Sequence, residues 1–161
     1  MKKVLKEPSE KLRMISDPVK RFTGKSQAKL SRLYCDMRDV FQNTNAIGLS
    51  AIQLGAPVRM IFMQEINYLV KPGGPKPFLV MINPEIMASI REDVGPEECL
   101  SCPGKSVRVW RAIRILVSWY NLGGTLFQRW FDGLESRIIQ HEIDHLDGKL
   151  ITDYDMEGKN A

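Results

Sequence analysis

The sequence predicts an α+β fold, and three observations carry this prediction. Apolar residues recur at helical spacing in two segments, one before residue 45 and one near the carboxyl end. Between them lie short runs of β-branched and apolar residues bounded by turn formers. Two of these runs flank Asn121-Leu122-Gly123-Gly124, a strong hairpin signal, so at least these two strands are expected to pair antiparallel.

The elements follow one another without a domain boundary. A first helix is predicted over 27–42, where one face is apolar: Leu30, Leu33, Tyr34, Met37 and Phe41. Four strands are predicted, at 58–63, 78–83, 113–120 and 125–131. The segment Lys71–Pro77 is predicted to be a loop, because neither side of it could form a core alone. We therefore expect a single domain over residues 1–161.

The second helix contains the only two histidines of the chain, His141 and His145. Asp132 is its predicted N-cap, with Glu135 as the reciprocal partner of a capping box, and Gly148 is its predicted stop. Two stripes follow its length, one of Leu134, Ile138, His141 and His145, the other of Ile139, Ile143 and Leu146.

Glu142 stands beside the first histidine and completes an HExxH motif. Residues at i and i+4 project from one helix face, so both imidazoles can bind a single metal ion. The adjacent glutamate stands where a metal-activated water needs a general base. The motif therefore predicts metal-dependent hydrolysis. The alternative, a solvent-exposed helix in which the HExxH pattern occurs by chance, is less favoured.

A catalytic site of this kind has three protein ligands and one open position, so a third ligand is required. The extended metalloprotease pattern fails, because Ile151 stands where that pattern has its third histidine. A small HExxH metallopeptidase would then need a carboxylate from the polar tail: Asp153, Asp155 or Glu157. The remaining candidates are the cysteines.

Three cysteines are present, and they differ in setting. Cys35 falls within the first predicted helix and is expected to be an ordinary helix residue. Cys99 and Cys102 form a CxxC pair that does not open a helix, which argues against a redox dithiol. Two interpretations stay open, a non-catalytic Cys2His2 zinc-stabilised module and an open site that uses one thiolate. Glu142 favours the open site, since a structural zinc ion has no use for a base.

Three segments, in order, resemble the three motifs of the peptide deformylase family. Residues 46–53, Ala-Ile-Gly-Leu-Ser-Ala-Ile-Gln, resemble a Gly-x-Gly-x-Ala-x-x-Gln motif. Residues 97–101 resemble Glu-Gly-Cys-Leu-Ser, and residues 140–146 match Gln-His-Glu-x-Asp-His-Leu. The resemblance implies antiparallel sheets packed around a central metal-binding HExxH helix. It also implies a short form without a further C-terminal helix, similar to organellar or phage-encoded members.

The resemblance implies that Cys99, His141 and His145 bind one divalent metal ion. Fe²⁺ is the expected native ion, and Zn²⁺ or Ni²⁺ could replace it, because a thiolate with imidazoles suits all three. The implied reaction removes the N-formyl group from the initiator formyl-methionine of nascent polypeptides and releases formate.

The resemblance also implies roles for residues around the metal. Glu142 would deprotonate the metal-bound water that attacks the formyl carbonyl, and would then protonate the leaving amine. The side-chain amide of Gln53 and the backbone N–H of Leu100 would hold the formyl oxygen. A pocket for the methionine side chain and the substrate backbone is expected from four residues: Ile47, Gly48, Leu134 and Ile138.

Five positions depart from the family pattern. Ala46 replaces a glycine, and Ser50 stands where alanine is usual. Glu98 replaces the glycine before the cysteine, which would alter the loop if that glycine needs a positive φ. Cys102 replaces an aliphatic residue, which favours packing over metal binding. Arg137 stands where the family tends to be apolar, and we expect it to point to solvent and to lie outside the site.

Composition agrees with a small enzyme of a reducing compartment. Apolar residues make up 43% of the chain, no uncharged run is long enough to span a bilayer, and the amino-terminal segment has no apolar signal region. Three cysteines, one of them expected on a metal, favour a reducing environment. We expect a cytoplasmic protein, in the host cytoplasm if phage-encoded, or an organellar one if a targeting peptide has been removed.

The charge balance is mildly basic, at +4 with a pI of about 9.0. Such a charge suits loose association with the ribosome that supplies nascent chains. Lys and Arg are scattered along the sequence without aromatic interleaving, so we expect no specific nucleic-acid site. We also expect no membrane partner and a monomeric chain.

Overall fold

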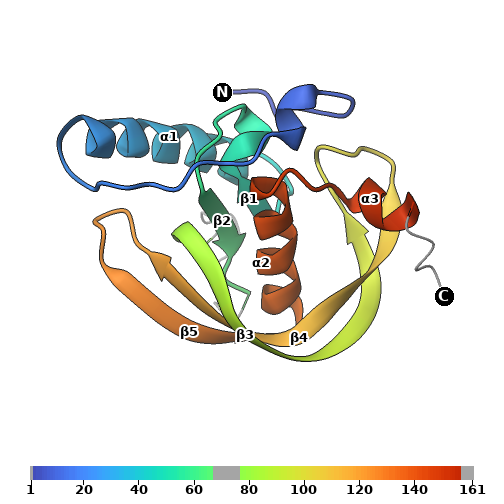
Figure 1. Ribbon diagram of the computed structural model, residues 1–161. Coiled ribbons are helices and arrows are strands. Elements are labelled where there is room, and N and C mark those ends of the chain that lie inside the picture. Colours follow the sequence, from blue (N-terminus) through green and yellow to red (C-terminus); the bar gives the residue numbers. More distant parts are fainter. Residues whose placement is uncertain (1, 67–76, 157–161) are drawn as a thin grey trace.

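The predicted strands form one antiparallel sheet in the computed structural model, which describes residues 2–66 and 77–156 (Figure 1). The α+β class is confirmed, but the described part of the chain has a single five-stranded sheet where more than one sheet was expected. Its order is β1-β2-β3-β4-β5, and each strand pairs antiparallel with the next. The strands are β1 (Gly48–Ser50), β2 (Met60–Gln64), β3 (Phe78–Glu98), β4 (Ser106–Tyr120) and β5 (Leu126–Asp132). The helices are α1 (Gly24–Gln42), α2 (Gly133–Leu146) and α3 (Ile151–Met156), with short 3-10 turns η1 (Glu10–Arg13) and η2 (Ala51–Leu54).

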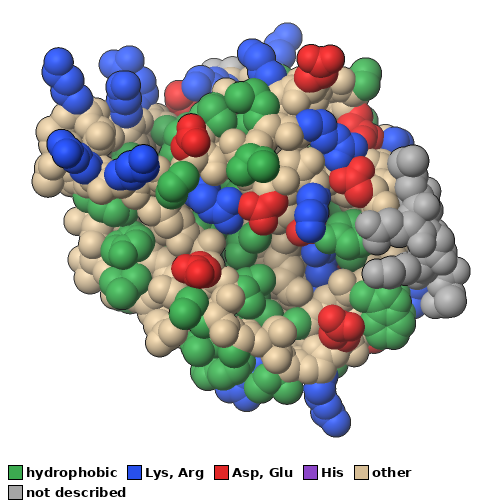
Figure 2. All heavy atoms as spheres, in the orientation of Figure 1, with side chains coloured by type: hydrophobic (Ala, Val, Ile, Leu, Met, Phe, Trp, Pro, Cys, Tyr) green, Lys and Arg blue, Asp and Glu red, His purple; other side chains and the backbone are tan. Residues whose placement is uncertain are grey.

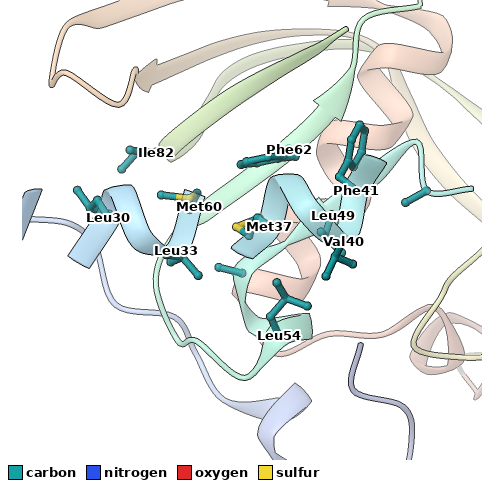
Figure 3. Close-up of a cluster of buried hydrophobic side chains, with 12 residues drawn as sticks. Leu30, Leu33, Met37, Val40, Phe41, Leu49, Leu54, Met60, Phe62 and Ile82 are labelled. Carbon is teal, nitrogen blue, oxygen red and sulfur yellow. The ribbon is translucent and has the colours of Figure 1, made fainter. Parts of the chain in front are cut away.

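Helix α1 covers one end of the sheet through the apolar face that the sequence predicts, and it begins three residues earlier than expected. Its buried side chains are Leu30, Leu33, Met37, Val40 and Phe41. Figure 3 shows Met37 of α1 close to Phe62 of β2, within a cluster that also includes Met60. Phe62 in turn stacks on Phe78 of β3, with 4.8 Å between ring centroids. Among the described residues, no helix is long and apolar enough to cross a membrane.

Strand β1 forms one edge of the sheet and pairs only with β2, with Gly48 opposite Met63. Strand β2 was predicted at 58–63 and is found two residues later at its start. The predicted loop Lys71–Pro77 lies outside the described residues except for Pro77.

The long β3–β4 hairpin is the main difference from the prediction. The strands predicted at 78–83 and 113–120 extend to Glu98 and back to Ser106. Register shifts near Asn83, which has a φ of 50°, and near Ile86 bend β3. Charged residues and Pro84 hid this extension, because a strand that curves around a helix exposes much of its length and loses a plain apolar alternation.

The CxxC segment is the tip of that hairpin. Helix α2 packs against the inner face of the hairpin, mainly against β4 (Figure 1). The hairpin between β4 and β5 is confirmed, with Asn121 N–H donating to Thr125 C=O at 2.9 Å. Strand β5 then runs directly into α2. A separate buried cluster joins the amino-terminal segment, the hairpin tip and α3: Leu12, Cys102, Val107, Val109, Leu150 and Ile151.

Candidate active site

Polar side chains hold α2 against β4. The Ser136 hydroxyl donates to the Ala112 carbonyl at 2.7 Å, and the Gln140 amide bonds both the N–H and the C=O of Ala112, at 3.0 and 2.9 Å. Asp132 is the N-cap as predicted, but its side chain makes no capping hydrogen bond, so the predicted capping box is wrong. Glu135 instead accepts a backbone N–H from the connection after β2 at 3.4 Å. The helix position is thus set by contacts to the sheet.

Three side chains with metal-binding atoms meet beside α2. Sγ of Cys99, just after β3, lies 3.2 Å from Nε2 of His145. The rings of His141 and His145 are 4.9 Å apart and almost perpendicular, at 83°. One ligand atom of each residue lies within 4.8 Å of the other two, and no further Cys, His, Asp or Glu of the described ranges joins this group.

A buried carboxylate orients the first histidine. Oε2 of Glu97 lies 2.9 Å from Nδ1 of His141, which leaves Nε2 of that ring free to face the other two side chains. Burial would raise the pKa of Glu97, but hydrogen bonds from His141 and Arg111 outweigh burial and hold the pKa at about 2. Burial lowers the pKa of His145 well below its usual value, so its imidazole is neutral, as a metal ligand must be.

This donor set fits a divalent metal ion. One sulfur and two imidazole nitrogens suit Zn²⁺ and Fe²⁺, and three protein donors leave a coordination position open. Glu142 supports the same interpretation, because its Oε2 is buried and has no hydrogen-bond partner among the described residues. Burial raises the pKa of Glu142 to about 7. A buried carboxyl group of this kind can exchange protons near neutral pH.

Gln53 is held in a defined orientation beside the three side chains. Its Oε1 accepts hydrogen bonds from the Ser50 N–H at 2.9 Å and from the Ser50 hydroxyl at 3.2 Å. Its Nε2 therefore points the other way, donating to the Ser101 hydroxyl at 3.1 Å and lying 3.6 Å from Sγ of Cys99. Ser50, Gln53 and Glu142 are all buried.

A cleft of about 780 Å³ opens over these groups. Among the residues that line it are the predicted site residues Ile47, Gly48, Gln53, Cys99, Leu100, Leu134, Ile138, His141 and Glu142. The second histidine, His145, lies deeper and is 1% exposed. Of the predicted pocket residues, Ile138 is buried, whereas Leu134 and Ile47 are about half exposed at the cleft mouth.

The expectation that Arg137 points to solvent is wrong. Its guanidinium donates to Oε1 of Glu97 at 2.9 Å, to the Val109 carbonyl at 2.8 Å and to the Asp93 carbonyl at 3.0 Å. Arg137 also lines the cleft. The Glu97 carboxylate and the backbone carbonyls along the hairpin offset the cost of burying this charge, which the helical position alone did not reveal.

The other departures from the family pattern cause small local changes. Cys102 is 1% exposed and packs in an apolar cluster, as predicted for a residue that does not bind metal. Cys35, which is not one of these departures, is an ordinary residue of α1 as predicted, and it is exposed. Glu98 is the last residue of β3 and is not among the positions with positive φ, so it fits the strand without the freedom of glycine.

Sequence reasoning missed two residues that shape the site, Glu97 and Arg111. They form a buried bidentate ion pair, with Nε–Oε1 and Nη2–Oε2 distances of 2.9 and 3.0 Å. Glu97 lies two residues before Cys99, and this spacing on a strand places both side chains on one face. That period was the available signal, but it required knowing that β3 extends to residue 98.

Comparison with known proteins agrees with this geometry. A family model described as polypeptide deformylase matches residues 1–160. The chain belongs to the peptide deformylase family. The peptide deformylase of Bradyrhizobium diazoefficiens is 35% identical over 156 residues, which cover 96% of this chain and 87% of that protein. The peptide deformylase of Dictyoglomus thermophilum is 36% identical over 150 residues, or 91% of this chain and 92% of the relative.

Solved structures show the same relationship. A probable peptide deformylase from Synechococcus phage S-SSM7 superposes with a TM-score of 0.84 at 32% identity, covering 96% of this chain and 99% of that one. A class I type b peptide deformylase from Acinetobacter baumannii, bound to Met-Ala-Ser, gives a TM-score of 0.83 at 32% identity, with 95% and 97% covered. Peptide deformylases are metal-dependent enzymes, and the Cys99, His141 and His145 group is a candidate metal site of this chain.

The close approach of β1 to α2 leads to a prediction for Gly48. A Cβ added there would collide with Oε1 of Glu142 and come within 2.9 Å of Cγ2 of Ile138. We expect Gly48→Ala to lower kcat/KM for a formylated peptide by at least ~10², because Glu142 is displaced, while bound metal is retained. Gly123→Ala is the control, since its Cβ would meet only Asn121 Oδ1 at 3.4 Å. Equal activity in the two variants would contradict the prediction.

Proposed function

We propose that this chain removes the N-formyl group from the formyl-methionine of nascent polypeptides and releases formate. The observation that carries the proposal is the convergence of Cys99, His141 and His145 beside a cleft that Gln53 and Glu142 also line. The Acinetobacter baumannii relative adds support, because it was crystallised with Met-Ala-Ser, the peptide that deformylation of formyl-Met-Ala-Ser would leave.

In this proposal Cys99, His141 and His145 hold one divalent ion, natively Fe²⁺, with Zn²⁺ or Ni²⁺ as replacements. The soft thiolate and the two imidazoles suit these ions better than Mg²⁺ or Ca²⁺, which prefer oxygen. When bound, the ion supplies Lewis acidity that polarises the formyl carbonyl and makes a water molecule acidic.

Glu142 acts as the general base and then as the general acid. Its Oε2 has no partner among the described residues, so it can accept the proton of the attacking water. As the formyl C–N bond breaks, Glu142 returns that proton to the leaving nitrogen. A carboxyl pKa raised to about 7 by burial suits both steps near neutral pH.

Gln53 and Leu100 stabilise the oxyanion that forms at the formyl oxygen. Because both Ser50 donors occupy Oε1 of Gln53, the amide N–H₂ is directed toward Cys99 before substrate arrives. Such a preorganised donor lowers an acyl-transfer barrier by about 3 kcal/mol. The backbone N–H of Leu100, a residue that lines the cleft, is the proposed second donor.

The methionine side chain enters a pocket formed by Ile47, Leu134 and Ile138. Ile138 is 4% exposed and closes the inner end, while the other two stand at the mouth. An unbranched, polarisable thioether suits such an apolar wall. Gly48 lies on the edge strand β1, so an extended substrate backbone can approach it and pair as an additional strand.

The two competing functions have less support. A Cys2His2 structural site would need Cys102, which lies in an apolar cluster outside the metal-binding group. A metallopeptidase would need a tail carboxylate, but Asp153 pairs with Arg13 at 2.5 Å and accepts the Leu150 N–H at 2.9 Å. The Asp155 side chain and Glu157 lie outside the described residues.

We also propose that residues 1–161 form one catalytic domain, and that the protein acts as a monomer in the cytoplasm or in an organelle.

Substrate choice tests the function as a whole. We expect the metal-loaded protein to hydrolyse formyl-Met-Ala-Ser and not its acetyl analogue, because a methyl group in place of hydrogen would crowd the oxyanion site. Formyl-Leu should be weaker, and formyl-Asp by far the weakest, because an unpaired carboxylate is costly to bury in an apolar pocket. Release of formate and of free amine, followed for each peptide, gives kcat/KM. Equal values for formyl-Met and formyl-Asp would rule out the proposed pocket.

The ligand set is tested by metal content. Cys99→Ser should lose most of the bound metal and activity, because a hydroxyl is a poor ligand beside two imidazoles. Cys102→Ala removes a sulfur of the same motif and should keep both. Metal analysis of the purified variants compares them directly, and equal metal loss in the two would favour the four-ligand structural site.

The role of Glu142 is tested by an amide of the same size. Glu142→Gln keeps most of the packing but cannot accept the proton, so kcat should fall by at least ~10² with metal content unchanged. Steady-state kinetics on the metal-loaded variant measures this. A kcat close to that of the unmodified protein would show that another group is the base.

A further inference from the structure

Lys and Arg are scattered along the sequence without a dense block, but the net charge is distributed unevenly. Residues 1–38 contain 11 Lys and Arg against 4 Asp and Glu, whereas residues 39–161 contain 12 against 15. The mildly basic total of +4 therefore conceals a net charge of +7 on the first 38 residues and −3 on the rest. Such asymmetry within one domain is typical of proteins with a polyanionic partner.

Five exposed cations gather at the start of α1, and we call them the basic face: Lys20, Arg21, Lys25, Lys29 and Arg32. No Asp or Glu occurs between residues 18 and 35. Lys25, Lys29 and Arg32 stand at i, i+4 and i+7, so they follow one side of the helix over about 10 Å. Figure 2 shows Lys and Arg side chains grouped over α1, which lies at the periphery of the molecule.

The five side chains of the basic face form no ion pair with any residue that the structure describes. The nearest acid along the helix, Asp36, is held by Lys2 at 3.0 Å. The turn that packs beside the start of α1, through the bond from Gln27 to the Leu122 carbonyl, is Asn-Leu-Gly-Gly and adds no charge.

Fold stability does not account for these cations. The amino end of a helix carries a partial positive charge, so Lys and Arg near it are unfavourable and Asp or Glu are preferred. The first turn of α1 contains no acidic residue, and its N-cap Thr23 makes no side-chain capping bond. The apolar face that anchors α1 lies on other positions, from Leu30 to Phe41.

We propose that the basic face is a docking surface for the phosphate backbone of RNA, bound without sequence specificity. A row of cations on a convex helix matches a chain of phosphates, whose neutralisation releases counterions. A lipid surface fits less well, because a membrane-binding helix also presents large apolar residues. None of the exposed large apolar side chains of the described residues lies between residues 16 and 46. The choice of RNA rests on the proposed function, since nascent chains emerge from a particle rich in RNA.

Fluorescence anisotropy with a labelled RNA hairpin tests the proposal on the full, metal-loaded chain. We compare the unmodified protein with Lys25→Glu/Lys29→Glu/Arg32→Glu across a range of about 50 to 200 mM salt. The substitutions introduce good helix formers at exposed positions, so α1 should remain folded. We expect Kd to rise by at least ~10-fold and the logarithmic salt slope to fall by about three.

A control with the same change of net charge is Lys11→Glu/Arg108→Glu/Lys149→Glu, at exposed positions outside the basic face. This variant should bind RNA within about twofold of the unmodified protein. Equal losses in the two variants would overturn the proposal in favour of overall charge. Binding by the basic face to anionic phospholipid vesicles but not to RNA would overturn it in favour of a membrane. Hydrolysis of formyl-Met-Ala-Ser is measured in parallel, and its absence would contradict the proposed function while leaving the RNA measurement intact.

Discussion

The carboxylate of Glu97 is the point at which the hairpin and the helix are joined. It accepts hydrogen bonds from Arg111 on β4 and from Arg137 on α2, and its other oxygen contacts His141. Removal of the Glu97 carboxylate would leave two buried guanidinium groups without their shared anion. The free-energy cost of those unpaired buried charges would be far larger than the net stabilisation that the intact cluster contributes. Because Cys99 lies two residues after Glu97, directly beyond the end of β3, the position of its sulfur beside His145 depends on the same contact.

The buried charges around Glu97 balance. Arg111 also bonds Asp144 at 2.6 Å, so two carboxylates face two guanidinium groups. Tyr154 of α3 donates its hydroxyl to Asp144 at 2.7 Å. Residues Glu97, Arg111, Arg137 and Asp144 thus form a network that fixes α2 with respect to the sheet and to α3. The network itself has no net charge, so the charges next to a bound metal ion would be those of the Cys99 sulfur and Glu142.

Arg137 shows how a helix can carry a charge beside the cleft. Its guanidinium passes over Gly95, where an added Cβ would lie 3.1 Å from it. The glycine leaves room for the side chain to reach the hairpin carbonyls, so the charged end bonds to the hairpin rather than to the apolar pocket residues. Ile138 stays buried and apolar beside the cleft. Arg137 and Gly95 are therefore best regarded as one steric unit.

The sequence was sufficient for the elements whose pattern is local. Helix α1, the turn at 121–124 and the helical spacing of His141 and His145 depend on neighbours within a few residues. Each is confirmed, although α1 begins three residues earlier than predicted. The extension of β3 beyond Asn83 was not predictable in this way, because its pairing partners on β4 are far along the chain and its curved backbone mixes polar and apolar residues. The orientation of Arg137 and the role of Glu97 were missed for the same reason. The proximity of Cys99 to the histidines came from family resemblance, since spacing alone left two ligand sets open.

The position of β1 at the edge of the sheet has a consequence for timing. A peptide that pairs with this strand must be extended over several residues, and a chain start already folded into a helix cannot adopt that shape. The amino terminus of a nascent protein can therefore bind in the cleft only after it has been synthesised and before it folds. Which nascent proteins are processed in the cleft would therefore depend on how fast each one folds as well as on its first residue. Proteins whose amino termini fold early would retain the N-formyl group more often than those whose termini stay extended.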